Sequence, residues 1–178
     1  MSFHIGPATV ADAEAIARVH VQGWREAYAG LLNPASLAGL SVEERTRMWQ
    51  ERLAGTDPGR LALIGRNGEG EIVGFAAGGA ARSEGAEPLG TDAEIYAIYL
   101  LDQVKRRRLG RALMAGLFGH FVRQGFASAG LWVLKDNAPA RRFYETLGGQ
   151  AGPEQELELR GQRVTEIVYR FEPIPVLA

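Results

Sequence analysis

The sequence predicts a mixed α/β (α+β) fold, with a central sheet of seven strands flanked by four helices. Strand-like and helical segments follow one another in the order β-α-α-β-β-β-α-β-α-β-β. One βαβ unit, residues 93–134, lies in the middle and predicts a pair of parallel strands, whereas the hairpin-like segments on either side predict antiparallel ones. The 178 residues contain no internal repeat and no linker, so we expect a single domain over residues 1–178.

The first part of the chain is expected to form a short strand and two helices. Residues 3–8 are strand-like, and residues 11–29 carry apolar side chains at helical spacing. Ser41 and Glu44 match the S-x-x-E capping box, which predicts a second helix over 41–53. The stretch LLNPASLAGL between the two helices is expected to interrupt the helical pattern.

The pattern then changes to the period of strands. Segments 60–66 and 71–80 are strand-like and are joined by the turn NGEG, and residues 82–90 form a polar loop. Residues 93–101 are apolar on both faces after Glu94, which predicts a central strand covered on both sides. The remaining expected elements are a helix over 109–123, a strand over 129–134, a helix over 137–148, and strands over 154–160 and 163–172.

Charge is distributed unevenly along the chain. The formal net charge is −1, but residues 91–178 carry 12 basic and 10 acidic groups, and five of those basic groups lie between Lys105 and Arg111. A chain of this charge has no overall attraction for nucleic acid. The absence of cysteine excludes disulfides and thiolate nucleophiles. No segment approaches the ~20 apolar residues of a membrane span, and no apolar leader is visible, so we expect a cytoplasmic protein without a membrane partner.

The cationic stretch DQVKRRRLGRAL, residues 102–113, lies between the central strand and the helix that follows it. In open α/β sheets, ligands bind beyond the carboxyl ends of strands, where the N–H groups at a helix start favour phosphate. The helix dipole opposes cations at that position, so several of them indicate a compensating anion. Two other interpretations stay open: a solvated charged face, and a nucleic-acid site. A single short cluster without interleaved aromatic residues makes nucleic acid the least favoured partner.

Two segments carry a family resemblance. The run AEIYAIYLLDQVKRRRLGRALM resembles the central motif of the GCN5-related N-acetyltransferases (GNAT), a strand followed by [Q/R]-x-x-G-x-[G/A] and a helix. NAPARRFYETLG, residues 137–148, resembles the second motif of the family, N-x-x-A-x-x-F-Y-x-x-x-G, and WREAYAGLL is similar to small bacterial acetyltransferases of the phosphinothricin-acetyltransferase type. The resemblance implies a GNAT-like fold, acetyl-CoA as co-substrate, and acetyl transfer to a primary amine by direct attack in a ternary complex.

The chain departs from the central motif at two positions. Lys105 replaces the first Gln or Arg and keeps a donor, whereas Arg108 replaces the first glycine. If residue 108 has a positive φ, its β-carbon costs on the order of 1–2 kcal/mol, and the arginine is a handicap. If residue 108 has a helical φ, the arginine fits and adds charge toward phosphate.

The resemblance also implies a cofactor site. In the family the central strand splays from its neighbour, here LWVL, and the pantetheine pairs with the exposed backbone like an added strand. The N–H of Ile98 then stabilises the oxyanion of the transfer step. The implied cofactor-binding residues are Ile98, Tyr99, Leu100, Lys105, Arg106, Arg107, Arg108, Leu109, Gly110, Arg111, Asn137 and Tyr144.

Two residues match positions with catalytic roles. Glu94 corresponds to a glutamate general base, which an amine acceptor needs because it is protonated at neutral pH; the alternative is a strand-end carboxylate in solvent. Tyr144 matches the motif tyrosine near the thioester sulfur, where a phenol can protonate the leaving thiolate; the alternative is a core tyrosine. Asn137 either binds the pantetheine arm, caps its helix, or does both.

The acceptor is expected on the first helix. Trp24, Glu26 and Tyr28 lie where the family covers the acceptor, although core packing also explains the two aromatic residues. The three histidines are widely spaced, so we expect no metal. The resemblance favours a homodimer and a small-molecule or peptide amine as acceptor, whose identity stays open. The alternative function is a catalytically weak GNAT-fold protein that binds CoA or another anion as a sensor or binding module.

Overall fold

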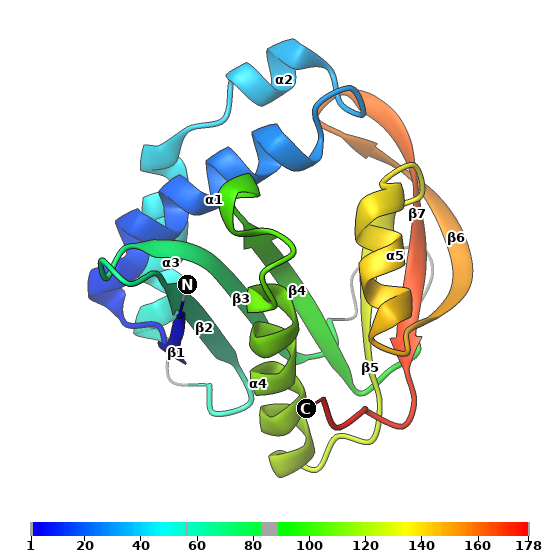
Figure 1. Cartoon of the computed structure of the whole chain (residues 1–178). Coiled ribbons are helices and arrows are strands. Elements are labelled where there is room, and N and C mark those ends of the chain that lie inside the picture. The colour runs from blue at the N-terminus through cyan, green and yellow to red at the C-terminus, as the bar shows by residue number, and fades with distance from the viewer. Residues whose placement is uncertain (1, 56, 83–88, 178) are drawn as a thin grey trace.

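The computed structural model describes residues 2–55, 57–82 and 89–177 (Figure 1). Its strands are β1 (His4–Pro7), β2 (Leu61–Arg66), β3 (Ile72–Ala80), β4 (Ala93–Leu100), β5 (Ala129–Leu134), β6 (Gln150–Leu159) and β7 (Gln162–Phe171). They form one seven-stranded sheet in the order β1-β2-β3-β4-β5-β7-β6. Only β4 and β5 are parallel neighbours, and the other pairs are antiparallel. The predicted mixed sheet is therefore confirmed. Most of the polar loop expected over 82–90 lies outside the described residues.

The helices differ from the expected ones at two places. They are α1 (Ala13–Ala27), α2 (Pro34–Ala38), α3 (Val42–Ala54), α4 (Leu109–Arg123) and α5 (Ala138–Thr146), with 3-10 turns η1 (Val10–Asp12) and η2 (Asp102–Val104). The first helix begins as the turn η1 because the backbone N–H of Thr9 donates to Asp12 Oδ2 at 2.9 Å. The short helix α2 was not predicted; its start is set by Pro34 and by Asn33 Oδ1, which accepts from the N–H of Ala35 at 3.0 Å.

The sheet has two faces, each covered by helices (Figure 1). Residues of α4 and α5 form one core with alternate strand residues such as Ile95, Leu131 and Tyr169. Residues of α1 and α3 form a second core with the opposite alternation, including Phe75 and Ala77. We call these the α4–α5 face and the α1–α3 face. A strand side chain is assigned to one of them by its alternation.

Two glycines anchor the start of α4 on the sheet. A β-carbon at Gly65 of β2 would lie 2.5 Å from Cδ1 of Leu109, and one at Gly74 of β3 would lie 3.2 Å from Cδ2 of the same residue. Leu109 is the first residue of α4 and is 1% exposed. Because these glycines leave room for its side chain, the helix start sits directly against the strands, and the preceding cationic loop is held at the end of β4.

Candidate functional site

The divergence of β4 from β5 opens the centre of the sheet. Their ladder consists of Ala93↔Ala129 and Glu94↔Gly130, after which β4 continues to Leu100. Figure 1 shows the two strands running apart toward the end where η2 leads into α4. The first three residues of β4 are buried, and the next five are partly exposed. The splay that the resemblance implies is therefore present, and the second half of β4 is less covered than its apolar sequence predicts.

The cationic loop forms the start of α4. The side chains of residues 105–108 are exposed, and Lys105 Nζ pairs with Asp102 Oδ1 at 2.5 Å. The N-cap residue Arg108 makes no side-chain cap hydrogen bond. The first N–H groups of a helix have no intrahelical acceptor, so this helix start is suited to an anion. Gly110 faces α5, since a β-carbon there would lie 3.2 Å from Cζ of Phe143.

The backbone of this loop decides between the two alternatives for Arg108. Its φ is 68° and its ψ is −2°, in the left-handed region, and Arg106 also has a positive φ of 58°. The helical-φ alternative is therefore wrong. A β-carbon in this region costs on the order of 1–2 kcal/mol, so the backbone of Arg108 is strained. A glycine at this position would adopt the same conformation without strain.

Glu94 lies on the α1–α3 face at the start of β4 and is 6% exposed. Both of its carboxylate oxygens accept hydrogen bonds from Arg82: Nη2 donates to Oε1 at 2.6 Å, and Nε and the backbone N–H donate to Oε2 at 3.1 and 3.0 Å. The guanidinium carbon of Arg82 also lies 4.4 Å from the ring centroid of Tyr96. Glu94 is thus a buried, paired carboxylate, unlike the solvent-exposed alternative.

Tyr144 and Asn137 belong to α5. Tyr144 is 8% exposed, and burial, followed by the charge of Tyr28, raises the pKa of its hydroxyl well above the usual value. Tyr28, the C-cap residue of α1, lies on the other face of the sheet and is close enough for its charge to act on Tyr144. Asn137 Oδ1 accepts from the N–H of Ala140 at 3.2 Å, so this residue caps α5.

An aromatic cluster closes the α1–α3 side of the divergence. The hydroxyls of Tyr28 and Tyr99 lie 2.9 Å apart, and the ring centroids of Trp24 and Tyr28 lie 5.0 Å apart. His20 stacks on Tyr99 with centroids 5.2 Å apart, and its Nδ1 accepts from Trp49 Nε1 at 3.2 Å. The structure therefore brings Trp24 and Tyr28 together beside β4.

Glu26 has a different environment from these two residues. One of its oxygens accepts from Gln22 Nε2 at 2.9 Å and the other accepts from the N–H of Asp102 at 2.8 Å. Because both oxygens are hydrogen-bonded within the protein, Glu26 joins α1 to the end of β4. This structural contact explains the position of Glu26, and no bound acceptor is needed to explain it.

Two further charged residues of the site were missed in the sequence. Glu166 lies on β7, opposite Leu134 of β5. Burial raises the pKa of its carboxyl, and the charge of Glu94 adds to this effect. The sequence contained a clue, since Glu166 shares a strand face with Val164 and Val168 and is the charged member of that row. Arg45 of α3 is half-buried, and its guanidinium carbon lies 5.4 Å from the ring centroid of Trp24.

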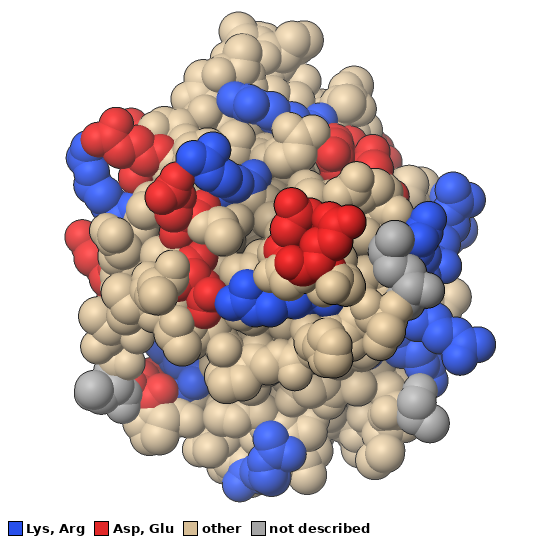
Figure 2. All heavy atoms as spheres, turned by 60° about the vertical axis from the view of Figure 1, so that its left-hand side comes forward, with Lys and Arg blue, Asp and Glu red and all other residues tan. Residues whose placement is uncertain are grey.

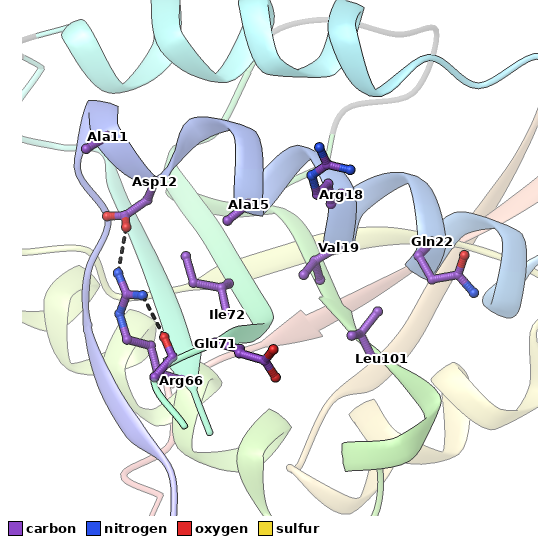
Figure 3. Close-up of a pocket in the computed structure, with 11 residues that line it drawn as sticks. Ala11, Asp12, Ala15, Arg18, Val19, Gln22, Arg66, Glu71, Ile72 and Leu101 are labelled. Carbon is purple, nitrogen blue, oxygen red and sulfur yellow. Dashed lines mark hydrogen bonds and ion pairs between the residues drawn. The ribbon is translucent and has the colours of Figure 1, made fainter. Parts of the chain in front are cut away.

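A separate groove of about 570 Å³ runs along α1 (Figure 3). Arg66 Nη2 pairs with Asp12 Oδ1 at 2.6 Å at one end of it, and Gln22 and Leu101 lie at the other. None of its lining residues is a predicted cofactor or acceptor residue.

The face shown in Figure 2 has acidic and basic side chains interspersed among uncharged ones. Its described atoms form no continuous basic surface of the kind that binds a phosphate backbone. Among the described residues, no group of three His, Asp or Glu side chains could hold a metal ion. No helix in that part of the chain is long and apolar enough to cross a membrane.

The splayed sheet and the anion-binding helix start are the features of an acyl-CoA-dependent transferase fold. The family model "Acetyltransferase (GNAT) family" matches residues 24–148, and this chain belongs to that family. It is accordingly an N-acetyltransferase. A relative from Bacillus subtilis (strain 168), "Uncharacterized N-acetyltransferase YuaI", is 34% identical over 160 residues, which cover 90% of this chain and 87% of the relative.

Solved structures show the same fold at low sequence identity. The PaiA N-acetyltransferase of Thermoplasma acidophilum, in complex with coenzyme A, has a TM-score of 0.71 and 17% identity, over 97% of this chain and 99% of that one. The putative acetyltransferase yncA of Salmonella typhimurium, with acetyl-CoA, has a TM-score of 0.71 and 19% identity, over 97% of this chain and 94% of that one. The GNAT-like fold predicted from the two motifs is confirmed.

Proposed function

We propose that the chain, as one N-acetyltransferase domain over residues 1–178, transfers the acetyl group of acetyl-CoA to a primary amine by direct attack in a ternary complex. The observation that carries this proposal is the divergence of β4 from β5, with the arginine-rich start of α4 beside it, the aromatic cluster of Trp24, Tyr28 and Tyr99 on one face and Tyr144 of α5 on the other. The cofactors seen in PaiA and yncA support acetyl-CoA as the donor.

Acetyl-CoA would lie on the α4–α5 face. The N–H groups at the start of α4 and the cations of residues 105–111 would bind its pyrophosphate. The backbone of residues 98–100 would pair with the acetyl-pantetheine, and the N–H of Ile98 would donate to the thioester oxygen as negative charge develops there. Asn137 stands at the start of α5, beside the path of the pantetheine arm.

The acceptor amine must lose a proton before it attacks. Glu94 and Glu166 lie on the α1–α3 face, close enough for the charge of Glu94 to raise the pKa of Glu166. We assign the proton to this pair of carboxylates, directly or through water. Glu94 accepts three hydrogen bonds from Arg82, whereas Glu166 interacts with Gln155 and has its pKa raised by burial, so we assign the first proton uptake to Glu166.

The leaving group is the thiolate of CoA. The amine nitrogen forms a bond to the carbonyl carbon, the carbon–sulfur bond breaks, and the nitrogen releases its surplus proton to solvent as the amide forms. The sulfur takes a proton from the Tyr144 hydroxyl, and solvent then reprotonates the tyrosine. The Tyr144 hydroxyl is protonated at neutral pH and can donate a hydrogen bond to the sulfur as negative charge develops there. Burial raises its pKa, so the proton itself moves only as the thiolate leaves.

The alternative is a catalytically weak protein that binds CoA, and the strained φ of Arg108 is the observation in its favour. Calorimetric titration with acetyl-CoA, followed by assay of CoA thiol release over a broad amine panel, separates the two. The transferase binds acetyl-CoA and releases CoA only when an amine is present. Binding without release across the panel supports the weak binder, and no binding at millimolar acetyl-CoA overturns both.

A homodimer and a cytoplasmic location are also proposals, and they rest on the family resemblance. β6 is the outer strand of the sheet beside β7, and its position makes it the natural place for contact with a second copy. Light scattering of the purified protein tests the dimer: a mass of twice 19.3 kDa supports it and a single mass contradicts it.

A further inference from the structure

Two arginines of α3 point toward the site without a carboxylate partner. Neither Arg45 nor Arg52 forms an ion pair among the described residues, whereas Arg47 of the same helix pairs with Glu43. Arg45 lies over Trp24 and its Nη1 contacts Met48 Sδ at 3.6 Å. The guanidinium carbon of Arg52 lies 5.7 Å from the ring centroid of Trp49. Both cations therefore rest on aromatic rings, and neither lies within ion-pair distance of a described carboxylate; the charge of Glu44 acts on Arg45 only from farther away.

Their surroundings add positive charge. Burial lowers the pKa of Arg45, and Arg160 at the turn between β6 and β7 lowers it further. Partial burial and the charges of Arg82, Arg45 and Arg60 lower the pKa of Arg52. Like charges gathered at a partly desolvated surface disfavour one another, and a bound anion removes that penalty.

These arginines belong to the same face as the proposed acceptor site. Arg45 is close enough to Tyr99 for the tyrosine to affect its pKa, and Tyr99 hydrogen-bonds to Tyr28 at the divergence of β4 and β5. The Nε1 of Trp24 is buried and meets no acceptor at hydrogen-bonding geometry among the described residues, although it lies close enough to the Tyr99 hydroxyl to oppose the rise that burial causes in the pKa of that group. A guanidinium and an indole N–H together are a donor set for a carboxylate or a phosphate.

The same face also carries carboxylates. Glu166 lies near Tyr28, whose pKa it raises, and near Glu94. The α1–α3 face therefore has both carboxylates and arginines around the rings of Trp24, Tyr28 and Tyr99. A ligand that matches both kinds of group has a cationic amine and an anion.

We propose that the acceptor is a primary amine that also carries an anionic group, a carboxylate or a phosphate. Arg45 and Arg52 bind the anion, Trp24 donates to it, and the amine lies on the Glu166 side, next to the divergence of the strands. This inference rests on the proposed acetyl transfer and narrows its acceptor. It disfavours polyamines, since their second cation would face the arginines.

Matched pairs of acceptors test the inference. Free amino acids are compared with the amines formed by their decarboxylation, and phosphoethanolamine with ethanolamine, by acetyl-CoA-dependent release of CoA thiol. We expect the anionic member of a pair to have a kcat/KM at least about tenfold higher, as for a hydrogen-bonded charge pair. The pair with the larger ratio identifies the anion as carboxylate or phosphate.

Variants of α3 assign the effect to a residue. Arg45→Gln should remove most of the preference by raising KM for the anionic acceptor more than KM for its uncharged partner. Arg45→Lys should keep part of the preference, because lysine retains the positive charge. The rest should be lost, because lysine lacks the planar guanidinium group. Arg47→Gln is the matched control on the same helix and should leave both acceptors unaffected, since Arg47 pairs with Glu43.

A binding measurement gives a readout that does not depend on turnover. Calorimetry with the N-acetylated amino acid and with the N-acetylated amine, each added to the CoA-loaded protein, should show tighter binding of the anionic product, and Arg45→Gln should abolish the difference. Equal acetylation of both members of each pair, or an unchanged preference in Arg45→Gln, overturns this inference alone. Binding of acetyl-CoA without acetylation of any amine overturns the proposed function and this inference with it.

Discussion

Arg82 and Glu94 are joined at three points, because Nη2 of Arg82 donates to one carboxylate oxygen at 2.6 Å, and its Nε and backbone N–H donate to the other. The contact holds a buried carboxylate beside the divergence of β4 and β5. It lies on the α1–α3 face, away from the helix start proposed to bind the cofactor. A substitution of Glu94 is therefore expected to change turnover without changing the affinity for the cofactor.

The first prediction concerns this carboxylate. Glu94→Gln should lower kcat by about 100-fold, because it neutralises one of the two carboxylates that take up the proton of the acceptor amine. It should leave the Kd for acetyl-CoA unchanged. Steady-state kinetics and calorimetry measure the two quantities. Glu156→Gln, on the exposed strand β6, is the control and should change neither. A kcat of Glu94→Gln equal to that of the parent contradicts the assignment.

The second prediction concerns the proposed proton donor. Tyr144→Phe removes the hydroxyl and keeps the ring, so kcat should fall by about tenfold or more while acetyl-CoA still binds. Tyr169→Phe is the matched control: the Tyr169 hydroxyl donates to Glu145 Oε1 at 2.6 Å and accepts from Arg141 at 3.1 Å, so its loss should affect stability and not turnover. If the two variants have the same kcat, Tyr144 is only a core residue.

The third prediction concerns the strained loop. Arg108→Gly should raise the free energy of unfolding by about 1 kcal/mol, because glycine adopts a positive φ without the β-carbon penalty. The strain is a cost to folding, whereas the exposed cation beside the proposed pyrophosphate site still favours the cofactor, so the same change should weaken acetyl-CoA binding severalfold. Urea unfolding and calorimetry check the two effects. Markedly tighter binding of acetyl-CoA by Arg108→Gly would instead identify the arginine as a handicap to the site.

The fourth prediction concerns His20. Burial, followed by the charges of Arg45 and Arg52, lowers its pKa from 6.5 to about 3. A histidine with a lowered pKa in the folded state takes up a proton more readily when unfolded, so the protein loses stability as pH falls from 6.5 toward 3. The loss is about 1.4 kcal/mol per pH unit.

Urea unfolding between pH 6.5 and 5 checks this dependence. The parent should lose about 2 kcal/mol more stability over this interval than His20→Gln, which cannot take up the proton. His4→Gln, at an exposed position, is the control and should behave like the parent. Parallel pH profiles for the parent and His20→Gln would show that His20 does not carry the effect.

Local patterns predicted most of the fold. The capping box of Ser41 and the alternation of β7 depend on neighbouring residues, and both elements form within a residue or two of their expected ends. The helix α2 was missed because its five residues are too few to show a helical period. The divergence of β4 from β5 came only from the family resemblance, since the register between two strands is a tertiary property.

The site residues also divide into those that local motifs predicted and those that only tertiary packing reveals. Glu94, Tyr144 and the loop before α4 lie in segments whose motifs are contiguous in sequence. Arg45 and Glu166 come from α3 and β7, and only the packing of both elements on one face brings them to the site. The φ of Arg108 could not be read from the sequence, because both of its alternatives were compatible with a helix start.

A crystal structure of the protein with acetyl-CoA tests the central claim most directly, that transfer occurs at the divergence of β4 and β5. The account predicts the thioester oxygen within hydrogen-bonding distance of the Ile98 N–H, the sulfur beside the Tyr144 hydroxyl, and the pyrophosphate on residues 106–111. Acetyl-CoA bound elsewhere, for example in the groove along α1 with the space between β4 and β5 unchanged, would contradict it.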